Sequence, residues 1–111
     1  METDSQGPLT VDRLAEGPGT PILVVDFVQF SATRPLSEEL GEHSRGHPVY
    51  RIDPVTDLTG EEGYRPLDAL VDGYAAACAG HGLPGGRLLV VGYCSAAPLA
   101  LRLAARFAST A

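Results

Sequence analysis

Apolar residues along the chain fall into short continuous runs separated by polar turns. Ile22 to Val28 is an apolar run interrupted only by Asp26, Val49 to Ile52 is a second run interrupted by Arg51, and Leu88 to Val91 is a third. Such runs of aliphatic and β-branched residues, bounded by turn signals, predict buried strands. Leu9 to Leu14 alternates apolar and polar positions, which predicts a half-buried edge strand that forms a hairpin with the first run.

Helical spacing marks the segments between the runs. Ser31 to His43 carries Leu36 and Leu40 four residues apart with glutamates on the other face, which predicts a short surface helix. A second helix is predicted from Pro66 to Gly80, and Ala96 to Ala108 is predicted as the last helix. The apolar stripe of the second helix consists of Leu67, Leu70, Val71, Tyr74, Ala75 and Cys78.

Strands that alternate with helices are typical of α/β proteins. Right-handed crossovers between apolar strands predict a mostly parallel sheet with helices on both faces, formed by residues 9–111 after a flexible segment at residues 1–8. In such sheets binding and catalytic sites lie at the carboxyl ends of the strands. Here those ends carry Asp26, Asp53 and the sequence from Gly92 to Ser95.

Composition narrows the function classes. The 111 residues are enough for one domain, and 8 basic against 14 acidic residues give a net charge of −6, which argues against nucleic acid or an anionic membrane as partner. The acidic start Met-Glu-Thr-Asp-Ser does not resemble a signal peptide, and no apolar run approaches the roughly 20 residues of a membrane span. We therefore expect a cytoplasmic protein whose 2 cysteines are free thiols, without a metal or cofactor.

The strongest candidate for chemistry is the turn between the last strand and the last helix. A nucleophile elbow places its reactive residue on a tight strand-to-helix turn, with small residues two positions before and after it. Gly92 and Ala96 occupy those positions around Cys94, in the sequence Gly-Tyr-Cys-Ser-Ala. The pattern differs twice from the usual Gly-x-Ser-x-Gly, because cysteine replaces serine and alanine replaces the second glycine.

Residues near the turn at Cys94 are candidates for stabilising the thiolate, for binding the oxyanion and for lining a pocket. The amino end of the last helix favours a thiolate at Cys94, and the backbone N–H groups of Ser95 and of Phe27 or Val28 are the candidate oxyanion donors. Tyr93 and two strand-end aspartates, Asp26 and Asp53, are candidate pocket residues.

Structural alternatives stand beside each of these assignments. Free cysteine is among the most buried residue types, so Cys94 also fits a small apolar filler, and Cys78 is expected in the core. Strand-end aspartates commonly form turns, and Tyr93 fits a packing residue. The three histidines, His43, His47 and His81, all precede Cys94 and are interpreted as solvated loop residues.

Four strings of the sequence resemble a known enzyme family. They are similar to the first half of the α/β-hydrolase thioesterases of polyketide and nonribosomal peptide synthesis. The four strings are residues 10–25, Pro48-Val-Tyr-Arg-Ile-Asp-Pro, Leu70-Val-Asp-Gly-Tyr-Ala-Ala-Ala and Leu89-Val-Val-Gly-Tyr-Cys-Ser-Ala-Ala. A cysteine at the elbow also resembles the thioesterase-like Dieckmann cyclases and the dienelactone hydrolases. The three strings before the elbow are similar to thioesterases, so we favour the thioesterase-like Dieckmann cyclases over the dienelactone hydrolases.

The resemblance implies a reaction and its partners. Cys94 would take an acyl chain from the phosphopantetheine thioester of an acyl or peptidyl carrier protein and release it by Dieckmann-type cyclisation or hydrolysis. In this fold the acid and the histidine of the triad follow the nucleophile, but neither residue type lies after Cys94. The sequence therefore predicts the amino-terminal part of a larger hydrolase fold, in which a carboxyl-terminal half or a second chain supplies Asp and His.

The sequence leaves one other function open and argues against a second. A noncatalytic hydrolase-like fragment would bind a carrier protein or another chain without reacting. A complete small flavodoxin-like domain would need phosphate-binding glycines after the first central strand, where the chain has Asp26-Phe-Val-Gln-Phe.

Overall fold

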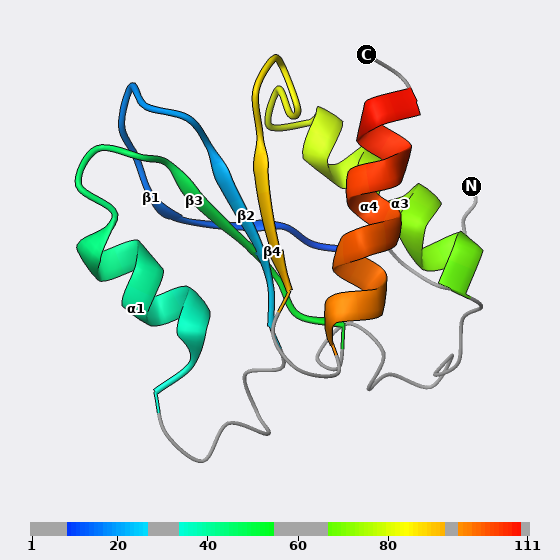
Figure 1. Ribbon diagram of the computed structural model, residues 1–111, viewed down its shortest axis with the longest axis horizontal. Coiled ribbons are helices and arrows are strands. Elements are labelled where there is room, and N and C mark those ends of the chain that lie inside the picture. Colours follow the sequence, from blue (N-terminus) through cyan, green and yellow to red (C-terminus); the bar gives the residue numbers. More distant parts are fainter. Residues whose placement is uncertain (1–8, 27–33, 55–66, 93–95, 110–111) are drawn as a thin grey trace, which may run out of the picture.

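The described chain alternates strands and helices in the predicted order (Figure 1). The computed structural model describes residues 9–26, 34–54, 67–92 and 96–109. Its elements are β1 (Asp12–Ala15), β2 (Ile22–Val25), α1 (Leu36–His43), β3 (Val49–Ile52), α3 (Leu67–Ala79), β4 (Leu89–Gly92) and α4 (Ala97–Ser109). The prediction for β3 is confirmed residue for residue, and the protein is a small α/β domain.

The strands form one mixed sheet in the order β1-β3-β2-β4. β2 is parallel to both of its neighbours, and Ile22 lies opposite Val49 of β3 on one side and Leu89 of β4 on the other. β1 is antiparallel to β3, with Asp12 opposite Arg51. Three parallel strands with one antiparallel edge strand agree with a mostly parallel sheet.

The predicted hairpin between the first two strands is wrong. β1 pairs with β3 and not with β2, because the crossover through α1 inserts β3 directly beside β2. The turn between β1 and β2 instead lies against the turn before β3, where Gly19 N–H donates to the Gly46 carbonyl at 2.9 Å. A Cβ on Gly17 would lie 2.1 Å from the same carbonyl oxygen, so glycine permits this close approach.

Helices cover both faces of the sheet, with α1 on one side and α3 and α4 together on the other (Figure 1). Side chains alternate between these faces along each strand. Leu23 and Val25 of β2, with Tyr50 and Ile52 of β3, belong to the core cluster that includes α3 and α4. The intervening Arg51 points toward α1, where its Nη1 lies 3.9 Å from a Glu38 carboxylate oxygen.

The apolar stripe predicted for α3 faces the core. Its buried members are Leu70, Val71, Tyr74 and Cys78, and α4 buries Leu99, Ala100, Leu103 and Phe107 against the same cluster. Two ion pairs join the outer surfaces of these helices, Arg102 with Asp68 and Arg106 with Asp72. None of the helices within the described ranges combines the length and the apolar character that a membrane crossing requires.

Candidate functional site

The sheet has a topological switch point beside β2. From the carboxyl end of β2 the chain proceeds to α1 on one face, whereas from the carboxyl end of β4 it proceeds to α4 on the other face. Connections that diverge from two adjacent parallel strands leave a crevice between them, and this is where α/β proteins bind their ligands. Val25 and Gly92, the last residues of the two strands, are directly paired. The two segments that the sequence singled out therefore start side by side.

Gly92 lies in very close contact with the start of α4. A Cβ placed on Gly92 would lie 2.5 Å from the Cβ of Ala100 and 2.9 Å from the Cα of Ala97. Real Cβ atoms do not approach other heavy atoms so closely, so no larger residue fits without a shift of the helix. Ala96 is completely buried on the other side of the turn. The small residues that an elbow requires thus occupy the tight positions of this junction.

The central residues of the candidate site lie outside the described part of the chain. Tyr93, Cys94 and Ser95 belong to residues 93–95, and Phe27 and Val28 belong to residues 27–33. The predicted nucleophile, oxyanion donors and pocket tyrosine therefore stay predictions. Residues 27–33 lie between β2 and α1, and residues 93–95 lie between β4 and α4.

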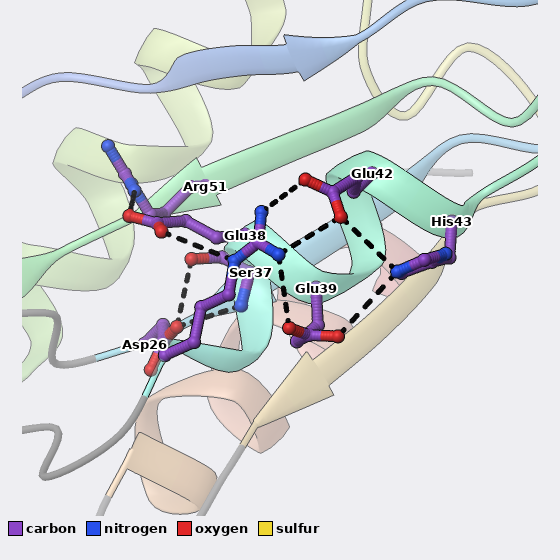
Figure 2. Close-up of polar contacts among 8 residues, drawn as sticks. Asp26, Ser37, Glu38, Glu39, Glu42, His43 and Arg51 are labelled. Atoms are coloured by element: carbon purple, nitrogen blue, oxygen red, sulfur yellow. Dashed lines mark hydrogen bonds and ion pairs between the residues drawn. The ribbon is translucent and has the colours of Figure 1, made fainter.

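Asp26 anchors α1 (Figure 2). Its side chain is 2 % exposed, and one carboxylate oxygen accepts hydrogen bonds from the Ser37 N–H at 2.9 Å and from the Ser37 hydroxyl at 2.8 Å. The first N–H groups of a helix lack partners within the helix, and the residue before α1, Pro35, makes no side-chain cap. Asp26 thus supplies from β2 the cap that the local sequence lacks, a role that its strand-end position alone did not reveal.

Arg34, which precedes α1 in the chain, holds the acidic face of this helix. Arg34 donates two hydrogen bonds to the Glu42 carboxylate, at 3.0 and 2.6 Å, and Glu38 and Glu39 lie within ion-pair distance. These hydrogen bonds hold the pKa of Glu42 below its ordinary value. The glutamates on this face are therefore charge-compensated within the protein itself.

The second strand-end aspartate, Asp53, follows β3 at the same edge of the sheet. It is half-buried and precedes the buried Pro54. Asp26 and Asp53 thus follow neighbouring strands, which satisfies the predicted placement of both carboxylates at the carboxyl edge.

The three histidines lie at the opposite edge, where the strands begin. His43 ends α1, His47 precedes β3, and His81 precedes β4. His47 Nδ1 lies 3.0 Å from the Thr20 carbonyl oxygen, so its ring is held by the backbone. All three therefore lie at the opposite end of the strands from the candidate site.

Cys78 is a core residue, as predicted. It is fully buried, and burial raises the pKa of its thiol to about 11. A thiol with this pKa is neutral near pH 7 and is a poor nucleophile. Within the described ranges, no group of three or more His, Cys, Asp or Glu side chains is arranged to hold a metal ion.

Comparison with models of protein families, with curated proteins and with solved structures finds no match to this chain.

Proposed function

We propose that this chain is the nucleophile-bearing part of a cysteine-dependent acyl-transfer enzyme of the α/β-hydrolase type. Cys94 accepts an acyl or peptidyl chain from the phosphopantetheine thioester of a carrier protein and passes it to cyclisation or hydrolysis. The observation that carries this proposal is the tight junction between Gly92 and α4, next to the switch point at β2. Packing of this kind is what an elbow needs in order to direct its central side chain out of the sheet.

The proposed first step exchanges one thioester for another. The Cys94 sulfur, as thiolate, attacks the carbonyl carbon of the carrier-bound thioester, and the tetrahedral oxyanion is stabilised by N–H groups at Ser95 and at Phe27 or Val28. The bond between that carbon and the phosphopantetheine sulfur then breaks, and the departing thiol takes up the proton that Cys94 lost. Because one thioester replaces another, the step is close to isoenergetic.

The proposed second step releases the product. A carbon next to a second carbonyl group, farther along the acyl chain, gives up a proton to the histidine base of the further segment described below. The resulting carbanion attacks the carbonyl carbon bound to Cys94, a carbon–carbon bond forms, and the bond to sulfur breaks to regenerate the thiolate. In hydrolysis, water takes the place of the carbanion and a carboxylic acid leaves. The thioester suits cyclisation because its carbonyl carbon is electrophilic and the Cys94 thiolate is a good leaving group.

The histidine and acid of this reaction would come from a further polypeptide segment, in the same or another chain. Among the described residues β4 pairs only with β2, so its outer edge offers unpaired backbone groups. Leu89 on β4 is 54 % exposed and Leu101 on α4 is 73 % exposed. Leu101 belongs to a row of residues on one flank of α4 that contains no charge: Ala97, Leu101, Ala104 and Ala108. This free apolar edge supports the proposal of a covering segment.

Acyl transfer from a small thioester tests the proposal. The full chain is incubated with an acyl-N-acetylcysteamine thioester, which carries the reactive end of phosphopantetheine, and the intact mass is measured. We expect one acyl adduct that disappears in Cys94→Ala and persists in Cys78→Ala, whose thiol is buried and neutral. An adduct on Cys78, or none on either residue, would support the noncatalytic alternative.

A further inference from the structure

A shallow pocket of about 420 Å³, widely open to solvent, lies at the amino ends of the strands, on the edge opposite the candidate site. Its walls come from the turn before β2, from Tyr50 of β3, and from the segment His81 to Arg87 that leads into β4. These segments are far apart in the sequence, so only the fold brings them together. The volume lies in the range of small-molecule sites, which is roughly 300–1,000 Å³.

The electrostatic character of the pocket is opposite to that of the protein. The chain has a net charge of −6, yet the described residues that line the pocket include Arg87 and His81 and no aspartate or glutamate. Within the described ranges, Arg13, Arg34, Arg51, Arg102 and Arg106 each face a carboxylate, whereas Arg87 makes no ion pair. The guanidinium of Arg87 therefore keeps its donors available for an anion in the pocket.

A buried tyrosine adds a second polar group. Tyr50 is 7 % exposed and forms part of the pocket wall, and its hydroxyl has no hydrogen-bond partner among the described residues. Among the described side chains Arg51 Nε, and not this hydroxyl, is the polar atom that is buried from solvent without a partner. The Tyr50 O–H therefore reaches the open space of the pocket and can donate to an acceptor there. The ring itself is fixed, because it packs edge-on against the His81 ring with 5.3 Å between centroids.

The histidine is fixed as well. His81 Nε2 lies 3.1 Å from the Val11 carbonyl oxygen, which only accepts, so Nε2 carries the proton. Beside it, the wall formed by His81 to Arg87 contains three glycines, of which Gly82 and Gly85 have φ of 80° and 65°. A ligand can therefore approach the backbone closely on that wall.

We propose that this pocket binds an oxyanion, the phosphate or carboxylate group of a small molecule, through the guanidinium of Arg87 with the hydroxyl of Tyr50 as a second donor. The proposal does not depend on chemistry at Cys94, because the pocket and the candidate site lie at opposite ends of the strands. Arginine forms paired hydrogen bonds with both kinds of anion.

Titration of the full chain with inorganic phosphate, and separately with acetate, tests this at constant ionic strength. Binding is followed by the amide resonances of Tyr50 and of residues 81–87 in two-dimensional NMR. We expect saturable shifts at these residues with at least one of the two anions; the stronger ligand identifies the preferred group. The same titration in Cys94→Ala should give the same affinity, which separates this site from the proposed acyl transfer.

Two arginine variants form the matched comparison. Arg87→Gln and Arg45→Gln remove the same charge from exposed residues that have no ion pair among the described residues, but only Arg87 lines the pocket. We expect Arg87→Gln to weaken binding at least tenfold and Arg45→Gln to change it less than twofold. Tyr50→Phe should weaken binding severalfold. Equal loss in the two arginine variants, or the absence of saturable shifts with both anions, would overturn the proposal.

Discussion

Gly92 and Ala100 lie in such close contact that a Cβ on Gly92 would be 2.5 Å from the Cβ of Ala100. The contact joins the end of β4 to the first turns of α4 and sets the tightness of the junction. Because the nearby Ala96 and Leu99 are also buried, the helix has little room to move away.

Gly92→Ala should therefore destabilise the protein. Overpacking of this kind costs about 1–3 kcal/mol, which denaturant unfolding would measure as a lower free energy of unfolding. Gly86→Ala is the matched control, since a Cβ at Gly86 meets no atom within 4 Å. Equal stability of Gly92→Ala and the wild type would show that the junction is looser than its geometry implies.

The hydrogen bonds between Asp26 and Ser37 should stabilise α1 substantially. Asp26→Ala removes a buried carboxylate that accepts two hydrogen bonds, and we expect a loss of about 1.5–3 kcal/mol in the free energy of unfolding. Ser37→Ala removes only the hydroxyl and should cost about 1 kcal/mol. A double-mutant cycle measures their coupling, and strictly additive losses would argue against the direct contact.

The neutral thiol of Cys78 should make stability depend on pH in the alkaline range. Its pKa rises from an ordinary value of 9.0 to about 11 in the folded protein because the thiol is buried. Between these values the unfolded state loses the proton and the folded state keeps it, so the free energy of unfolding falls as pH rises. The contribution is fully present below pH 9.0 and is lost as the pH approaches 11.

Cys78→Ala provides the comparison for this effect. The variant should be less stable at neutral pH because of the cavity, and the difference from the wild type should shrink between pH 9 and 11. Chemical denaturation at several pH values checks this. A difference that stays constant with pH would mean that the thiol ionises equally well in both states.

Two leucines two residues apart on α4 should respond differently to substitution. Leu103 is fully buried, and Leu103→Ala should cost about 2–5 kcal/mol in the free energy of unfolding. Leu101 is 73 % exposed, so Leu101→Ala should change the stability of the chain by less than about 0.5 kcal/mol. A large loss for Leu101→Ala at low protein concentration would indicate that α4 packs differently.

The order of the elements and the class of fold could be predicted from the amino-acid sequence. Strand and helix signals are local: the short segment Val49–Ile52, bounded by turn residues, and the apolar stripe around Leu70 and Tyr74 specify their own conformations. The small residue at Gly92 was also predictable, because a tight turn from a strand into a helix leaves no room for a larger side chain at that position.

Strand pairing and the roles of the polar residues became clear only in the folded chain. Neither the insertion of β3 between β1 and β2 nor the capping of α1 by Asp26 follows from neighbours in the sequence, since both join residues more than ten positions apart. The same holds for the pocket around Arg87, whose walls come from three distant segments. Strand pairing and polar contacts depend on which distant segments the crossover connections bring next to each other. A local sequence pattern contains no information about these neighbours.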